Sequence, residues 1–278
     1  MSTCSSLLER MINTVPSEVI LSDLILPIPF TARDYLLSIN QDGTLNLQVT
    51  ADVLAPALNN NRVVTLHWND RESTSCASSA CSVSSIQTTQ DTSLRNGFTL
   101  QSYKFSVNVN ATISFSNFWF TVDEDGNGTN ITTQNNGGMN YPVDDFIVNV
   151  PAYTCGILFG SEPYIARITT AVRIDPSASA PINVTVEASF QNQTTFIPIL
   201  STVQASLSTS PLISPIPELY VYYAALVPGD TGDVCAYDAF EFSATIGKEV
   251  HTGPRLIGPC TVRAFGINSC FECDTCFP

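Results

Sequence analysis

The chain has 278 residues, of which 44% are hydrophobic and only 13% charged, and it carries a formal net charge of −14. Such a composition excludes an intrinsically disordered protein, because disorder requires low hydrophobicity and high charge. The 11 basic residues form no cluster, and no stretch reaches the roughly 20 apolar residues of a membrane helix, so we expect no nucleic-acid partner and no membrane span.

The first predicted element is a short helix that starts at the N-cap Ser5 and ends before Pro16. It is shorter than the ~12–15 residues that an isolated helix needs, so we interpret residues 1–20 as a helical remnant and linker. The same residues contain neither the basic nor the apolar region of a secretory signal peptide. Our hypothesis is that the chain is the C-terminal part of a longer secreted precursor.

After this helix the hydrophobic residues recur with a period of two, which is typical of β-strands with one buried face. The alternating runs are separated by Gly, Asn and Pro, as in antiparallel sandwiches. We therefore predict an all-β fold with two antiparallel β-sandwich modules of the immunoglobulin or fibronectin type, over residues 21–155 and 156–278. The clearest runs cover residues 44–50, 63–69, 105–110, 165–174, 184–188 and 220–224.

Residues 123–140 are rich in Gly, Asn and Thr and predict a long, solvated connection. Asp123, Asp125 and Asn127 match the first ligands of a calcium-binding loop, but Gln134 replaces the bidentate Glu at its twelfth position. A plain turn is therefore the favoured interpretation, with a weak calcium site as the alternative.

Nine cysteines predict disulfide bonds and an oxidising compartment. Four residues separate Cys76 from Cys81, which indicates a local disulfide, whereas Cys4 stands alone. The Cys-x-x-Cys spacing near the C-terminus also occurs in zinc and iron–sulfur sites, whose fourth ligand would have to be Cys235, Cys260 or His251. We favour disulfides and no metal. The predicted disulfide cysteines are Cys76, Cys81, Cys155, Cys235, Cys260, Cys270, Cys273 and Cys276.

The Asn-x-Thr pattern of N-glycosylation occurs five times. Together with the cysteines, it predicts a secreted, extracellular glycoprotein, although no signal peptide is present in this chain. The acceptors are Asn110, Asn127, Asn130, Asn183 and Asn192.

The two histidines, His67 and His251, stand in no hydrolase or zinc-protease motif. His67 falls on the polar side of its strand, and His251 falls in a predicted turn. We therefore expect no catalytic residue and no cofactor in this chain.

Several segments resemble a known family. Residues 14–22 (TVPSEVILS) resemble the end of the helical catalytic domain of secreted ascomycete-type fungal haem peroxidases, and residues 42–45, 64–71, 146–151 and 183–186 resemble their β-rich C-terminal extension. The resemblance implies that haem belongs to a helical domain that this chain lacks. Neither histidine matches the haem-ligand or peroxide-cleaving motifs of that family, so no catalytic residue is carried over.

The expected function is thus a non-catalytic secreted domain that stabilises its parent or contacts a surface. Its expected partners are a covalently preceding peroxidase domain or a cell-wall polysaccharide. Two alternatives stay open: a fragment of a peroxide-dependent oxidoreductase whose activity lies in the missing domain, and an extracellular adhesin or carbohydrate-binding module. The aromatic residues that could make the contact are Trp68, Trp119, Tyr220, Tyr222 and Tyr223.

Overall fold

The computed structural model describes residues 5–7, 28–71, 76, 81–85, 88–93, 98–157, 165–174, 182–191, 198–208, 216–228, 239–253 and 256–257. Residues 5–7 are helical, whereas most of the predicted helix lies outside the described residues. Within the described ranges, no helix has the length and apolar character needed to cross a membrane. Several predicted sites also lie outside them, namely Cys4, Cys235, Cys260, Cys270, Cys273, Cys276 and Asn192.

In the described part of the chain, 65% of the residues lie in β-strands and 4% are helical, which confirms the predicted all-β fold. The first half contains β1 (Phe30–Ile39), β2 (Thr44–Ala55), β3 (Val63–Asn69), β4 (Ser82–Ser85), β5 (Thr88–Ser93), β6 (Thr99–Asn110), β7 (Asn117–Asp123), β8 (Ile131–Gln134) and β9 (Tyr141–Pro142). The second half contains β10 (Ile147–Asn149), the 3-10 helix η1 (Pro151–Tyr153), β11 (Cys155–Ile157), β12 (Ile165–Arg173), β13 (Ile182–Gln191), β14 (Pro198–Gln204), β15 (Ser206–Leu207), β16 (Tyr220–Pro228), β17 (Ala239–Ile246), β18 (Glu249–Thr252) and β19 (Leu256–Ile257).

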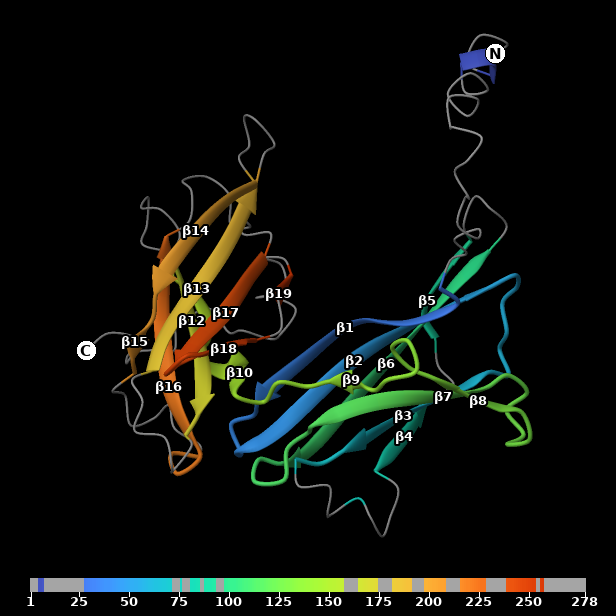
Figure 1. The fold of residues 1–278 in the computed structure, drawn as a ribbon, viewed down its shortest axis with the longest axis horizontal. Helices are drawn as coiled ribbons and strands as arrows, with labels where there is room; N and C mark the ends of the chain where they lie inside the picture. Colours follow the sequence, from blue (N-terminus) through green and yellow to red (C-terminus); the bar gives the residue numbers. More distant parts are fainter. Residues whose placement is uncertain are drawn as a thin grey trace, which may run out of the picture.

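One long sheet runs through both halves (Figure 1). Its nine strands include the path β15-β16-β12-β10-β1-β2-β6-β5, with β11 paired to β12. The two halves meet where β1 and β10 pair in parallel, with Ser38 opposite Asn149. Two smaller sheets complete the fold: β4-β3-β7-β8 with β9 in the first half, and β14-β13-β17-β18 with β19 in the second.

The small sheets cover opposite faces of the long sheet. Leu37 belongs to the core beneath the β3–β7 sheet, whereas its neighbour Leu36 belongs to the core beneath the β13–β17 sheet. This follows from the strand geometry, because successive side chains point to opposite faces. Contacts between aromatic rings join the two sheets in the first core. The rings of Phe30 and Phe120, for example, have centroids 5.1 Å apart. The junction strand β1 is consequently buried on both faces where the halves meet.

Two details differ from the expectation. The predicted open connection over residues 123–140 contains a short strand, β8, which pairs with β7. The long sheet also continues across residue 155, where Cys155 of β11 pairs with Arg167 of β12. The proposed module limits and the immunoglobulin or fibronectin type remain predictions.

Candidate functional site

The outer face of the β4-β3-β7-β8 sheet carries the polar and aromatic groups of the candidate site. On β3, Val64 and Leu66 are buried in the first core, so the alternate residues Thr65, His67 and Asn69 face outward. β7 follows the same rule, with Trp119 on its outer side between two buried phenylalanines. The pairing register sets His67 directly opposite Trp119.

Trp119 and His67 stack on each other. Their ring centroids are 5.5 Å apart and their planes differ by 13°. His67 Nε2 shares a hydrogen bond of 2.9 Å with Thr121 Oγ1, the next outward residue on β7. Partial burial lowers the pKa of His67, because desolvation penalises the charged imidazolium. The indole is thus held by a neutral ring and remains half-exposed.

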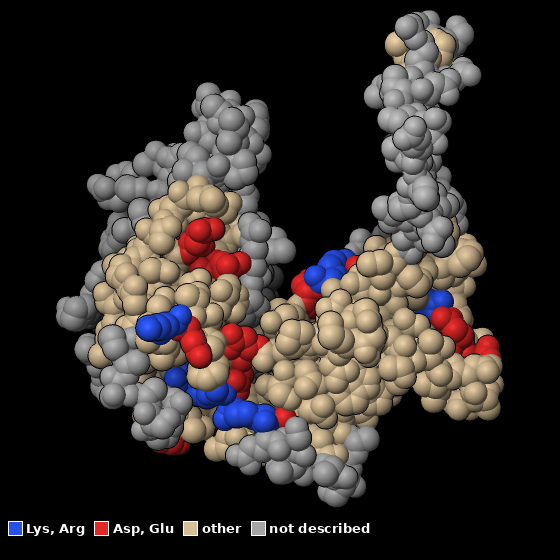
Figure 2. Space-filling view, viewed as in Figure 1, with Lys and Arg blue, Asp and Glu red and all other residues tan. Residues whose placement is uncertain are grey.

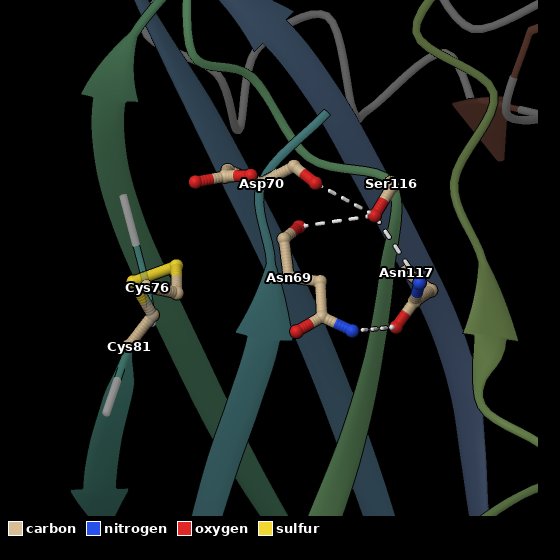
Figure 3. The surroundings of a disulfide bond; sticks show 6 residues. All are labelled: Asn69, Asp70, Cys76, Cys81, Ser116 and Asn117. Carbon is tan, nitrogen blue, oxygen red and sulfur yellow. Dashed lines mark hydrogen bonds between the residues drawn. A yellow bond between two sulfur atoms is a disulfide. The ribbon is translucent and has the colours of Figure 1, made fainter. Parts of the chain in front are cut away.

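Hydroxyl and amide groups surround this aromatic pair. Thr65 Oγ1 and Ser84 Oγ are 2.7 Å apart on β3 and β4. On the other side, Asn69 Nδ2 donates to Asn117 Oδ1 at 3.1 Å, and Figure 3 shows this pair beside Ser116. The arrangement presents an aromatic surface flanked by uncharged groups that donate and accept hydrogen bonds.

The predicted Cys76–Cys81 disulfide is present at the edge of this sheet (Figure 3). The two Cα atoms are 5.3 Å apart, within the usual range for a disulfide. The carbonyl oxygen of Cys81 accepts a hydrogen bond of 3.1 Å from the Trp68 amide. The disulfide therefore links Cys76 to Cys81, the residue directly before β4.

The other aromatic candidates are turned toward the cores. Trp68 packs edge-on against Phe115, with centroids 6.1 Å apart. Tyr220 and Tyr222 are buried, and burial raises the pKa of Tyr222 to about 12. Tyr223 is half-buried against the second core. Of the five predicted contact residues, Trp119 is thus the one on an open face of a sheet.

The four predicted glycosylation acceptors within the described ranges, Asn110, Asn127, Asn130 and Asn183, are all exposed. Asn110 Oδ1 accepts hydrogen bonds from the Thr112 amide at 2.9 Å and the Thr112 hydroxyl at 2.8 Å. Their accessibility is compatible with glycosylation, which stays a prediction.

In the candidate calcium loop, the carboxylate oxygens of Asp123 and Asp125 accept hydrogen bonds from other residues of the loop. Asp123 accepts hydrogen bonds from the backbone amides of Asp125, Gly126 and Gly128. Asp125 Oδ2 accepts one of 2.8 Å from Asn130 Nδ2. Among the described residues, no three Cys, His, Asp or Glu side chains gather as metal ligands. Both carboxylates thus accept hydrogen bonds from within the loop, and the weak calcium site stays a prediction.

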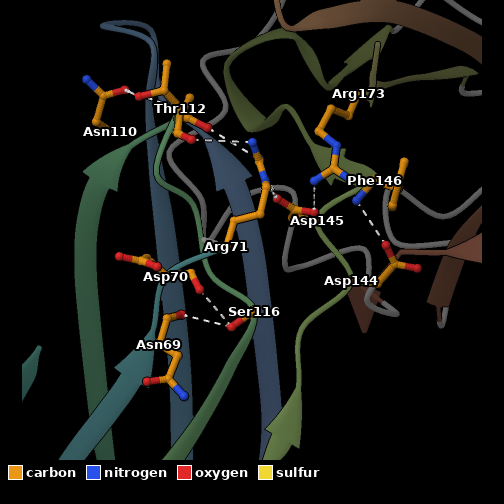
Figure 4. Close-up of polar contacts among 11 residues, drawn as sticks. Asn69, Asp70, Arg71, Asn110, Thr112, Ser116, Asp144, Asp145, Phe146 and Arg173 are labelled. Carbon is orange, nitrogen blue, oxygen red and sulfur yellow. Dashed lines mark hydrogen bonds and ion pairs between the residues drawn. The ribbon is translucent and has the colours of Figure 1, made fainter. Parts of the chain in front are cut away.

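A second polar cluster lies at the junction of the halves and was not anticipated from the sequence (Figure 4). Asp145 pairs with Arg71 from the first half and with Arg173 from the second. The Arg173 guanidinium carbon lies 3.7 Å from the ring centroid of Phe146, and His251 stacks on Phe146 with ring centroids 4.1 Å apart. His251 lies in β18 rather than in a turn. The signal in the sequence is weak, since these residues come from separate segments and form no local motif.

No family model and no curated protein matches this sequence. The functional inference therefore depends on the geometry of the site.

Proposed function

We propose that the chain is a non-catalytic, extracellular surface-contact module that binds an uncharged polysaccharide through the outer face of the β4-β3-β7-β8 sheet. The observation that carries the proposal is the half-exposed Trp119, stacked on His67 and bordered by Thr, Ser and Asn. An aromatic ring offers an apolar platform for the C–H face of a sugar, while amides and hydroxyls match the hydroxyl groups at its rim.

The charge of the molecule supports an uncharged partner. The net charge of −14 disfavours acidic polymers, and the outward residues around Trp119 are Thr65, His67, Asn69, Asn117 and Thr121. None of these carries a charge at neutral pH, because the pKa of His67 is lowered. Figure 2 shows that charged atoms form only small groups on the visible face of the molecule.

A pull-down on insoluble cellulose, chitin and β-glucan tests the proposal. We expect the wild-type protein to be retained by at least one of these polymers and Trp119→Ala to be released into the supernatant. Trp119→Phe keeps an aromatic platform and should retain part of the binding. Leu226→Ala, an exposed apolar change outside this face, is the control. Equal retention of wild type and Trp119→Ala would refute the assignment of this face.

We also infer that the protein is secreted and N-glycosylated, supported by the exposed acceptors and the Cys76–Cys81 disulfide. Protein from a secreting eukaryotic host should lose mass on treatment with an N-glycosidase. An unchanged mass would contradict the inference.

The resemblance to fungal haem peroxidases supports a covalently preceding catalytic domain as the partner. The genomic sequence upstream provides the test: an open frame for a signal peptide and a helical haem domain is expected, and an unrelated frame would refute the parentage. If the chain itself acted as a peroxidase, haem reconstitution would give a Soret band and peroxide turnover; we expect neither.

A further inference from the structure

A pocket of about 310 Å³ opens at the end of the first core that lies away from the junction. It is bounded by the start of β1, the end of β2 and the end of β7. Its apolar wall includes Phe30, Ala55 and Val122, and its polar wall consists of Arg62, Glu124 and Gln134. The volume is at the lower end of the roughly 300–1,000 Å³ that is typical of small-molecule sites.

Arg62 is the unusual member of this wall. The residue is only 3% exposed, which is rare for an arginine. Its Nε donates to Glu124 Oε2 at 2.8 Å and its Nη1 donates to Gln101 Oε1 at 2.5 Å. Its Nη2 makes no hydrogen bond with the described residues and is not among their fully buried polar atoms, so this N–H group is open to solvent or to a ligand. A residue that lines the pocket thus keeps one donor without an acceptor among the described residues.

The charge of Arg62 is already balanced. Glu124 Oε2 accepts from both Arg62 and the side-chain amide of Asn59. Glu124 Oε1 accepts no hydrogen bond from the described residues, and the side chain is 48% exposed. The Arg62–Glu124 ion pair in the pocket wall therefore keeps one donor and one acceptor without partners among the described residues, and Gln134 adds an amide to the same wall.

A carboxylate ligand suits this site poorly. It would satisfy Arg62 but would lie beside the Glu124 carboxylate, in a protein of net charge −14. A hydroxyl group both accepts and donates, so neighbouring hydroxyls can accept from Arg62 and donate to Glu124. The apolar wall then faces the C–H side of the ligand.

We propose that this pocket binds one neutral, polyhydroxylated ring of the size of a single pyranose. The site is separate from the Trp119 face, because Val122 and Ala55 belong to the inner side of their strands. The proposal does not depend on polysaccharide binding at Trp119.

The Arg62 Nε–H resonance provides the readout, since a hydrogen-bonded and buried Nε–H exchanges slowly enough to be followed by NMR. We would titrate the protein with methyl β-D-glucopyranoside, methyl α-D-mannopyranoside, myo-inositol and sodium benzoate. At least one of the neutral ligands should shift this resonance in a saturable way, and benzoate should not. A shift with benzoate alone, or with none of the four ligands, would overturn the proposal.

Two variants of the pocket wall and two controls extend the test. Ala55→Leu fills the pocket and should abolish the shift. Glu124→Gln keeps the shape of the wall and should weaken binding by about tenfold, because it removes a charged acceptor. Leu226→Ala should bind like wild type. Trp119→Ala should also keep the shift, so failure of this proposal and failure of the polysaccharide proposal are distinguishable.

Discussion

Asp145 forms ion pairs with an arginine from each half of the molecule. Its side chain is 8% exposed and pairs with Arg71 and Arg173, with Arg71 Nε 2.7 Å from Asp145 Oδ2. Asp145→Asn would leave two partly buried arginines without their carboxylate. We expect this change to lower the free energy of unfolding by about 3 kcal/mol, measured by urea denaturation.

Asp34 provides the matched control for Asp145. It lies 3.7 Å from Arg33, with both side chains largely exposed. Asp34→Asn should cost less than about 1 kcal/mol, because solvent screens such pairs. Equal losses for the two variants would show that the junction cluster does not stabilise the fold.

The lowered pKa of His67 makes the free energy of unfolding depend on pH. Burial lowers its pKa in the folded state, so the unfolded chain binds the proton more readily. The free energy of unfolding should therefore fall as the pH drops below about 6.5, and level off once folded His67 is protonated. His67→Gln should show a shallower fall, because the variant lacks this titrating group. Urea unfolding at several pH values measures the difference, and identical slopes would contradict it.

At the scale of elements, the turn after β7 depends on glycine. Gly126 has φ of +67°, and a Cβ there would lie 2.5 Å from the backbone oxygen of Asn61. Gly128 has φ of +76°, but a Cβ there would meet nothing within 4 Å. Gly128→Ala should cost about 1 kcal/mol for its backbone conformation alone, and Gly126→Ala should cost more because of the clash. Thermal unfolding of both variants compares them; a larger loss for Gly128→Ala would contradict the structure.

Individual strands could be predicted from the sequence, whereas their partners could not. Leu45, Leu47 and Val49 alternate with polar residues because β2 has one face on the first core, and this period is visible in the chain. The sequence shows no pattern that would predict the pairing of Ser38 with Asn149. Strand β10 has only three residues, and because all three are buried they do not alternate.

The same limit applies to the candidate site. The alternation of β3 placed His67 on the polar side, as the structure has it, and Trp119 was among the predicted contact residues. Their stacking depends on the register between β3 and β7, and a shift of one residue would separate them. The pocket residues Arg62 and Glu124 flank different strands, so only the fold brings them together.

At the scale of the whole molecule, the long sheet couples the two halves, so we expect them to unfold together. Strand β1 pairs with β2 of the first half and with β10 of the second, and its neighbouring residues Leu36 and Leu37 contribute to different cores. Asp145 adds an ionic link between the halves, because it pairs with Arg71 of the first half and Arg173 of the second (Figure 4). Unfolding one half would expose an edge and a core surface of the other.

Equilibrium unfolding in urea, followed by two signals in one sample, tests this claim most directly. Both tryptophans, Trp68 and Trp119, lie in the first half, so fluorescence reports that half, whereas far-UV circular dichroism reports the strands of both. The shared sheet predicts coincident transitions with one midpoint. Two separate transitions, with fluorescence following only one of them, would contradict it.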